Sequence, residues 1–435
     1  MKTGSCFKSF VKYSSLNVLG MLGLSCYILA DTFFIAKGLG ADGLAALNLA
    51  IPVYSFIHGS GLLIGMGGSI KYSILKNQGQ WSAVNQIFTN AVFFTLSLAA
   101  VFFTLGLFCS APMTRMMGAD GTIYEMSRIY LQVILLFSPM FLCNNLLLCF
   151  VRNSGAPQLS MAAMASGSLS NILLDYIFIF PLRMGILGAV LATGIAPIIS
   201  MLTLLPFFLK RKNNFHLCRC KASLKQWTDI FSGGLPSLIA EISSGTVIIV
   251  FNKIILDLQG NLGVAAYGII ANLSLVTMSI YTSIAQGIQP ILSGNYAKNL
   301  SANVRNILRY ALLTVAVMST IIYAGIFLGA EQITGLFNSQ RNAHLQGIAV
   351  HGLKYYFTAC IFAGFNIVVC AYFTSTEHGR PAHVISFLRG FALLIPMAFL
   401  LSSMGGMTGV WLAFPVTEGI VSLLGAALLR HASRI

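Results

Sequence analysis

Four polar residues within apolar stretches of the sequence could together bind a cation: Asp31, Asn171, Asp175 and Thr193. Asn171 and Asp175 are four residues apart, a spacing that places both side chains on one face of a helix. Carboxylate, amide and hydroxyl oxygens suit a hard cation, and two adjacent carboxyl groups can instead share a proton. The alternative is that each residue separately satisfies a backbone group or pairs with a neighbouring helix. The first interpretation predicts a site for Na+ or H+.

The elements that must position these residues are membrane helices. The chain has 435 residues, of which 57% are hydrophobic and 9% are charged, whereas a soluble protein carries about 25% charged residues. The apolar runs are too long for barrel strands, which alternate over about 10 residues. A carboxylate in a lipid-spanning helix is costly, so Asp31 and Asp175 must face protein or a water-filled cavity. The sequence therefore predicts an all-α integral membrane protein.

A spanning helix needs about 20 residues, so the length leaves room for about twelve of them. We predict spans at 13–36, 44–66, 84–108, 122–148, 159–180, 186–209, 235–257, 264–290, 305–328, 347–374, 382–403 and 407–430. In this scheme Asp31, Asp175 and Thr193 all lie about 8–10 Å below the outer surface, at 1.5 Å per helical residue. Asn171 lies one turn deeper. This matching depth favours one shared site.

Basic residues are distributed unevenly between the loops on the two sides of the membrane. The loops on the side of the termini carry 18 of the 26 Lys and Arg residues, and the opposite loops carry five. Cytoplasmic loops are enriched in Lys and Arg, so we expect both termini in the cytoplasm and the chain in the cytoplasmic membrane. The net charge of +15 is spread over many short loops rather than gathered on one face. No nucleic-acid partner is therefore expected.

The two halves of the sequence resemble each other. LGADGLAAL at 39–47 parallels QGNLGVAAY at 259–267, which places Gly40 and Gly260 220 residues apart. Six spans in each half make this a parallel repeat, with a pseudo-two-fold axis along the membrane normal. We predict twelve transmembrane helices in two pseudo-symmetric six-helix bundles around a central cleft. The predicted parts are an N-terminal lobe at 1–209, a cytoplasmic linker loop at 210–234 and a C-terminal lobe at 235–435.

Three further charged residues lie at membrane depth and are candidates for lining the cleft: Glu241, Glu418 and Arg389. For Glu418 and Arg389 the alternative is an ion pair with each other. Glu241 has no evident basic partner at its depth, so a cleft-facing role and a structural role both stay open. His58, in the second span, is expected to be a hydrogen-bonded helix contact rather than a proton carrier.

No motif in the sequence points to an enzyme. The glycine-rich end of the second span is not followed by the Lys-Ser/Thr of a phosphate-binding loop, and neither H-E-x-x-H nor G-x-S-x-G occurs. His216, Cys218 and Cys220 form an H-x-C-x-C cluster in a basic loop, but their spacing differs from that of known metal sites. We therefore expect no cofactor, no metal beyond Na+ at the four-residue site, and transport driven by an ion gradient.

Six stretches of the sequence carry a family resemblance. They are ILADTFFIAKGLGADGLAALNLAIP at 28–52, RNSGAPQL at 152–159, NILLDYIFI at 171–179, GAVLAT at 188–193, GIQPILSGNYAKN at 287–299 and GVWLAFP at 409–415. Together they resemble the multidrug and toxic compound extrusion family, called MATE, over nearly the whole chain. The resemblance implies the fold of that family, twelve helices in two lobes, and its activity, drug export coupled to inward flow of Na+ or H+.

The family has a cation site in its N-lobe, built from an Asp in helix 1, an Asn and an Asp four apart in helix 5, and a Thr in helix 6. The resemblance places these roles on Asp31, Asn171, Asp175 and Thr193, the residues that depth groups. One branch of the family has an essential acid deeper in helix 7, which has no counterpart here. Glu241 lies earlier, after GLPSLIA, as in the bacterial branch. No C-lobe cation site is therefore carried over.

We expect a cation-coupled antiporter, working as a monomer in membrane lipid, that exports amphipathic and cationic organic compounds. The first alternative is a flippase for lipid-linked precursors from the same superfamily. Its anionic substrates would require several basic residues in the cleft, and only Arg389, Lys253 and Lys354 are available. The second alternative is a membrane-embedded enzyme or a channel. No catalytic set supports the enzyme, and the two-fold repeat with a blocked acidic pocket argues against an open pore.

Overall fold

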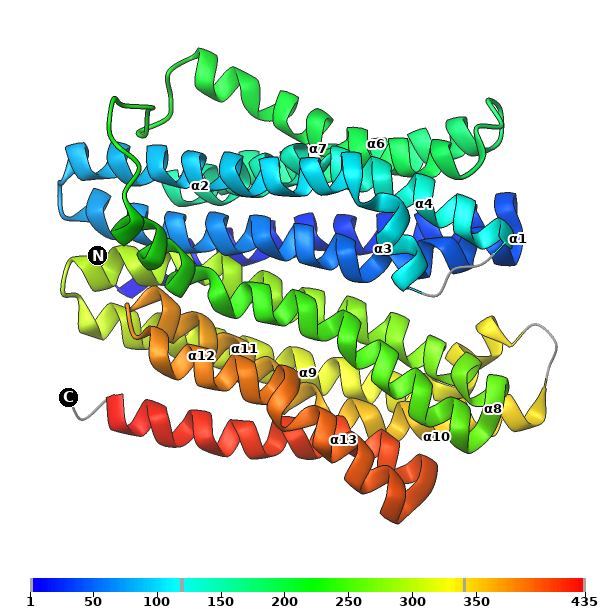
Figure 1. Cartoon of the computed structure of the whole chain (residues 1–435). Helices are drawn as coiled ribbons and strands as arrows, with labels where there is room; N and C mark the ends of the chain where they lie inside the picture. The colour runs from blue at the N-terminus through cyan, green and yellow to red at the C-terminus, as the bar shows by residue number, and fades with distance from the viewer. Residues whose placement is uncertain (1–2, 118–120, 339–341, 433–435) are drawn as a thin grey trace. The chain divides into compact units, whose positions relative to one another are not determined.

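The computed structural model describes residues 3–117, 121–338 and 342–432, and every regular element within them is helical (Figure 1). The α-helices are α1 (Thr3–Asn77), α2 (Trp81–Phe108), α3 (Ser110–Met116), α4 (Gly121–Leu136), α5 (Ser138–Ser154), α6 (Pro157–Ile179), α7 (Gly185–Leu209), α8 (Leu224–Ala297), α9 (Ser301–Phe337), α10 (Ala343–Tyr356), α11 (Cys360–Ser375), α12 (Gly379–Phe387) and α13 (Leu394–Ala432). A 3₁₀ turn at Phe357–Ala359 joins α10 to α11, and a π-helical turn at Leu388–Ala392 follows α12. The predicted all-α class is confirmed.

Two of these helices are far too long for a single membrane crossing. The helix α1 has 75 residues and α8 has 74, about 110 Å each at 1.5 Å per residue, against about 30 Å of hydrocarbon in a bilayer. Both are broken by a glycine with positive φ, Gly40 in α1 and Gly260 in α8, and Gly406 breaks α13 in the same way. Residues with a side chain disfavour this conformation, so glycine permits the sharp turn. We call 3–40 and 41–77 the first and second limbs of α1.

The number of membrane crossings follows from these breaks. In the described part of the chain, nine helices are long and apolar enough to cross a membrane, and α4 with α5, bent by 47°, adds a tenth. That count takes α8 as one helix and the residues Gly379–Ala432 as another. Dividing these two at Gly260 and Gly406 gives twelve crossings, as predicted. Several helices extend past the predicted spans, because helical hydrogen bonding continues beyond the apolar part of a span.

The backbone repeats between the two halves of the chain. Gly40 has φ 69° and ψ −156°, and Gly260, 220 residues later, has φ 62° and ψ −158°. The bend between α4 and α5 comes at Phe137, and the 3₁₀ turn between α10 and α11 begins at Phe357, again 220 residues later. Matching departures from helical geometry at one spacing confirm the pseudo-symmetric repeat predicted from the sequence.

By packing, the chain divides into two units. The N-terminal unit comprises residues 15–242 and 296–299, and the C-terminal unit comprises the remaining described residues. The start of α1 therefore packs in the C-terminal unit, where the rings of Phe7 and Tyr310 meet edge to face at 5.4 Å. The start of α8 packs in the N-terminal unit. The lobes at 1–209 and 235–435 are defined by chain order and stay a prediction, and α8 already begins within the 210–234 segment.

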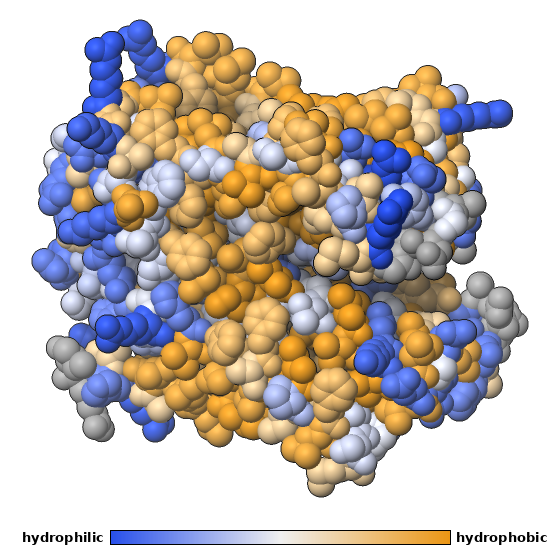
Figure 2. Space-filling model, in the orientation of Figure 1, coloured by the Kyte–Doolittle hydropathy of each residue, from blue (hydrophilic) through white to orange (hydrophobic). Residues whose placement is uncertain are grey.

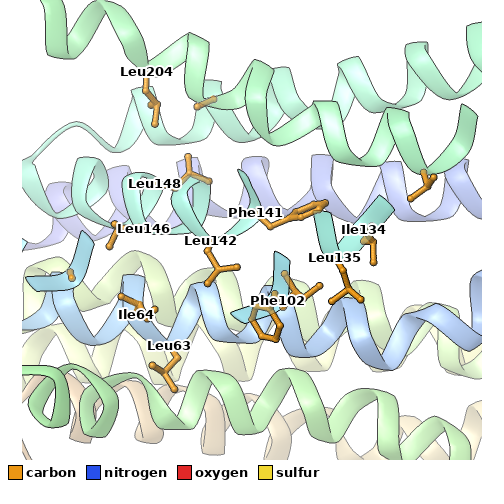
Figure 3. Packing of buried hydrophobic residues seen from close by; sticks show 14 of the residues in the cluster. Leu63, Ile64, Phe102, Ile134, Leu135, Phe141, Leu142, Leu146, Leu148 and Leu204 are labelled. Atoms are coloured by element: carbon orange, nitrogen blue, oxygen red, sulfur yellow. The ribbon is translucent and has the colours of Figure 1, made fainter. Parts of the chain in front are cut away.

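The interior and the surface of the helices differ as membrane helices require. Figure 3 shows part of the core of the N-terminal unit, where Ile64 of α1, Phe102 of α2, Leu142 of α5 and Leu204 of α7 are buried. On the surface, hydrophobic side chains cover the flanks of the helices and hydrophilic ones gather toward their ends (Figure 2). Apolar flanks of this kind suit contact with lipid.

Glycines bring the second limb of α1 and the start of α8 into close contact within the N-terminal unit. A Cβ atom on Gly67 would clash with the backbone of Ile230, and one on Gly234 would clash with the backbone of Leu63. Small residues allow this approach of helix backbones in membranes. The two pairs also fix the register, which is antiparallel, because the residue number falls along one helix as it rises along the other.

Candidate ion-binding site

The first limb of α1 and helix α6 are packed so that their two aspartates meet. Gly23 lies against Ser168, whose Cβ is 3.8 Å from the place that a Cβ on Gly23 would take. These two residues are 145 apart in sequence, and Asp31 and Asp175 are 144 apart. Two helices that pack in parallel keep a nearly constant offset, so the register that joins Gly23 to Ser168 also joins Asp31 to Asp175.

The carboxyl groups of Asp31 and Asp175 lie within hydrogen-bonding contact of each other. Asp31 is 7% exposed and Asp175 is fully buried. On each residue the Oδ1 atom has no hydrogen-bond partner among the described residues. Two carboxyl groups that contact each other in a low dielectric do not both carry a negative charge, because the two charges would repel strongly. Chemically, the arrangement suits a shared proton or a bound cation.

Asn171 and Thr193 complete the group that the sequence predicts. Both are buried, Asn171 one turn before Asp175 on α6 and Thr193 on α7. In the amide orientation that satisfies both neighbours, Asn171 donates to Asp175 Oδ2 at 3.1 Å and accepts from the backbone N–H of Thr193 at 3.2 Å. The structure thus brings all four predicted residues together. Their role in ion binding stays a prediction.

Three tyrosines that the sequence analysis did not single out surround this group. The hydroxyls of Tyr27 and Tyr54 hydrogen-bond to each other at 2.9 Å, and the hydroxyl of Tyr130 hydrogen-bonds to Thr193. Tyr27 and Tyr130 both interact electrostatically with Asp31. Tyr27 lies one helical turn before Asp31, a spacing that could have signalled its proximity. Nothing in the sequence marks Tyr54 or Tyr130 in this way.

Glu241 has a partner that the sequence did not reveal. Its Oε2 atom lies 3.5 Å from Nδ1 of His58. The two meet because Gly59 faces Glu241, with 2.9 Å between the glutamate Cβ and the place that a Cβ on Gly59 would take. The Glu241 side chain is 32% exposed and that of His58 is 14% exposed. The sequence held one signal of this contact: His58 and Glu241 lie at similar distances from the inner ends of their predicted spans.

The other two cleft candidates, Glu418 and Arg389, form the ion pair that the sequence offered as their alternative. Arg389 donates from Nε and Nη2 to Glu418 Oε1, at 3.0 and 2.7 Å. Asn366 donates from Nδ2 to Glu418 Oε2 at 2.7 Å. The side chain of Glu418 is 1% exposed. In this geometry the guanidinium charge is matched by a carboxylate inside the C-terminal unit.

The H-x-C-x-C cluster lies on an extended segment that is attached to α2. The backbone N–H of His216 donates to Asn85 Oδ1 at 2.9 Å, and that of Cys218 donates to Thr89 Oγ1 at 3.0 Å. Desolvation and the neighbouring Cys218 thiol raise the pKa of the Cys220 thiol. Among the residues that the structure describes, no three His, Cys, Asp or Glu side chains are grouped so that they could hold a metal ion.

Comparison with known proteins identifies the family. The sequence model of the MatE family matches residues 18–177 and 236–400, three quarters of the chain. The chain belongs to the MatE family. The match covers both halves, and the segments 18–177 and 236–400 include Asp31, Asn171 and Asp175 as well as Glu241. The chain is therefore a multi-pass membrane transporter rather than an enzyme, as the sequence predicts.

The chain is also similar to characterised relatives and solved structures. It is 26% identical to the multidrug export protein MepA of Staphylococcus saprophyticus subsp. saprophyticus, over 98% of this chain and 93% of that protein. It is 25% identical to the protein of the same name in Staphylococcus aureus strain MSSA476, over 97% of this chain and 93% of that protein. A solved multidrug resistance MATE family transporter in an outward-facing conformation aligns with a TM-score of 0.92 at 22% identity, over 98% of this chain and 95% of that one. A MOP superfamily transporter from Pyrococcus furiosus aligns with a TM-score of 0.91 at 23% identity, over the same shares. The structural likeness establishes the predicted fold.

Proposed function

We propose that this transporter is an antiporter that exports amphipathic organic cations in exchange for a cation bound between Asp31 and Asp175. The observation that carries this proposal is the contact between their buried carboxyl groups. A shared proton is enough to satisfy that contact, so the geometry supports H+ as the coupling ion. Na+ would fit if the two carboxyl groups separate, with the oxygen atoms of Asn171 and Thr193 as further ligands.

The coupling follows from electrostatics. A cation between Asp31 on α1 and Asp175 on α6 attracts both carboxylates and so holds the two helices together. Without the cation both carboxylates are charged and repel, which favours a different packing of the first limb of α1 against α6. An ion gradient can drive transport only if the site binds the ion differently in the two states. Asp31 and Asp175 lie on different helices. The Asp31–Asp175 contact therefore changes when these helices repack, and the affinity for the ion changes with it.

The expected substrate class rests on charge and on the relatives. The matched relatives are named multidrug export proteins. Glu241 offers a partly exposed carboxylate in the N-terminal unit, which suits a cationic compound. Arg389 is neutralised by Glu418, which removes one of three basic candidates for an anionic, lipid-linked substrate. We further propose that both termini are cytoplasmic.

Efflux from proteoliposomes tests this proposal. Purified protein is reconstituted, the cationic dye ethidium is loaded, and a proton gradient and a Na+ gradient are imposed separately at equal membrane potential. The proposal expects efflux that depends on one of these gradients, with the proton gradient favoured by the carboxyl contact. Efflux that responds to neither gradient would contradict the antiport mechanism.

A further inference from the structure

A line of contacts leads from the ion site to Glu241 within the N-terminal unit. Tyr27 interacts electrostatically with Asp31, one helical turn away on the first limb of α1. Its hydroxyl hydrogen-bonds to that of Tyr54, on the second limb, at 2.9 Å. The ring of Tyr54 stacks on the ring of His58, with centroids 5.8 Å apart and an interplanar angle of 16°. His58 Nδ1 lies 3.5 Å from Glu241 Oε2.

The two ends of this line differ in access. Asp31 is buried, whereas Glu241 has a side chain that is 32% exposed. The far end therefore has the accessibility that a binding site for an organic cation requires. His58 lies between, 14% exposed, and its backbone carbonyl accepts a hydrogen bond from Asn145 Nδ2 at 3.3 Å.

The hydrogen bond between Tyr27 and Tyr54 has two possible directions, since either hydroxyl can donate. An ionised Asp31 attracts the hydroxyl proton of Tyr27, which leaves Tyr27 to accept from Tyr54. When Asp31 shares a proton or holds a cation, this bias is lost and Tyr27 can donate to Tyr54 instead. The reversal turns the Tyr54 hydroxyl dipole, and Tyr54 interacts electrostatically with both Asp31 and Glu241. An element with two arrangements that both sites bias is what energetic coupling requires.

The second limb of α1 and the start of α8, which carry Tyr54, His58 and Glu241, are closely packed against each other. A Cβ atom on Gly59 would lie 2.9 Å from Glu241 Cβ and 3.1 Å from Leu238 Cδ1. The backbone contacts of Gly67 and Gly234 hold the same two helices together further along. Close packing of this kind limits how far the two helices can move to accommodate a change at Tyr54.

We propose that the His58–Glu241 pair is a recognition site for the organic cation, and that its affinity is linked to the occupancy of Asp31 and Asp175 through the Tyr27–Tyr54 hydrogen bond. This inference rests on the proposed function. Binding of the organic cation at Glu241 weakens binding of the coupling ion and the reverse, because linkage is reciprocal. Each tyrosine acts as a positioning residue, and Glu241 contacts the substrate.

Equilibrium binding tests the link without any gradient. The dissociation constant of ethidium is measured by fluorescence for the full-length protein in detergent, with Asp31 intact and with Asp31→Asn. We expect Asp31→Asn to change this constant about fivefold or more in the otherwise wild-type chain. In the Tyr54→Phe background, which keeps the ring and removes the hydroxyl, we expect a change below about twofold. Tyr27→Phe is expected to give the same result as Tyr54→Phe.

Tyr72→Phe is the matched control, because Tyr72 is a buried tyrosine on the same limb of α1 and packs against Phe150 and Phe215 instead. In this background the full effect of Asp31→Asn should persist. The inference is overturned if the effect of Asp31→Asn survives in both Tyr27→Phe and Tyr54→Phe, or is absent in the wild type. It is also overturned if Glu241→Gln leaves ethidium affinity unchanged. Efflux that depends on a gradient could still be observed in each of these cases, so the two proposals fail separately.

Discussion

Arg389 and Glu418 form an ion pair in the C-terminal unit, with 2.7 Å between Nη2 and Oε1, in which Glu418 is buried and Arg389 is half-buried. The remaining carboxylate oxygen accepts from Asn366, so both oxygens of Glu418 are satisfied. The N-terminal unit contains instead two carboxyl groups, those of Asp31 and Asp175, that contact each other. The C-terminal unit thus carries its own fixed cation in the form of a guanidinium, which suits a structural element better than an ion-exchange site.

Breaking this pair should destabilise the protein. Glu418→Gln leaves the half-buried guanidinium of Arg389 without its counter-charge, and up to about 3–5 kcal/mol of folding stability is lost when one partner of a buried pair is removed. The double substitution of Arg389→Met with Glu418→Leu removes both charges and should restore most of that loss. Thermal unfolding in detergent measures both. As a control, Arg128→Met disrupts the exposed pair with Glu125, at 3.8 Å, and should change stability by less than about 1 kcal/mol. An equal loss of stability in the double and the single variant would contradict the prediction, because it would show that the unpaired charge is not the cause of the loss.

The glycine contacts between α1 and α8 give a second stability prediction. Gly67→Ala and Gly234→Ala each place a methyl group into the backbone of the facing helix, so each should cost about 1–3 kcal/mol or more. Gly268→Ala, also within α8, meets no atom within 4 Å and should be neutral or slightly stabilising. Melting temperatures of the three variants in one detergent would test this. Similar melting temperatures for Gly67→Ala and Gly268→Ala would contradict the close packing.

The orientation of the chain can be tested with reporters. The distribution of basic residues predicts that a reporter inserted at Asn214 is cytoplasmic and that one inserted at Arg183 is external. Asn214 lies in the extended segment between α7 and α8, and Arg183 lies in the turn between α6 and α7. A reporter fused after Arg434, which lies outside the described residues, should also be cytoplasmic. An external signal from Asn214 would reverse the proposed topology.

The sequence predicts the number of helices well, because apolar length is a local property. It also groups Asp31, Asn171, Asp175 and Thr193, because the depth of a residue can be counted along a helix. Depth does not tell which way a side chain points around the helix axis. For that reason Tyr54 and Tyr130, at no special spacing from the aspartates, were missed.

Contacts between distant helices were harder to predict for a related reason. The meeting of His58 and Glu241 depends on the antiparallel register that Gly59 and its neighbouring glycines allow, and this register is set by tertiary packing. Arg389 lies in a π-helical turn, where the extra residue shifts the direction of every following side chain. A sequence analysed with a uniform helical period cannot show such a shift. The ion pair with Glu418 was therefore only one of two alternatives.

Charge selectivity should depend on Glu241. Glu241→Gln keeps the shape of the side chain and removes its charge, so efflux of cationic compounds should fall more than efflux of neutral ones. We expect a loss of about tenfold or more for ethidium and about twofold or less for a neutral dye, measured in the same proteoliposomes. Glu125→Gln, at an exposed glutamate, is the control and should change neither. Equal losses for both classes of compound would indicate that Glu241 has a folding role.

Ion coupling should depend on Asp31 and Asp175 together. A monovalent cation that crosses 100 mV supplies about 2.3 kcal/mol, enough for more than tenfold accumulation if it is fully coupled. Asp31→Asn and Asp175→Asn keep the shape of the site and remove its ability to bind and release a cation, so each should abolish gradient-driven efflux while the protein stays folded and inserted. The double variant should be hardly worse than either one, because residues that act as one unit are not additive. Asp229→Asn, at an exposed position near the start of α8, should pump normally. If either variant at the site still pumps at nearly the wild-type rate under a cation gradient, that residue is structural and Glu241 becomes the next candidate for the coupling site.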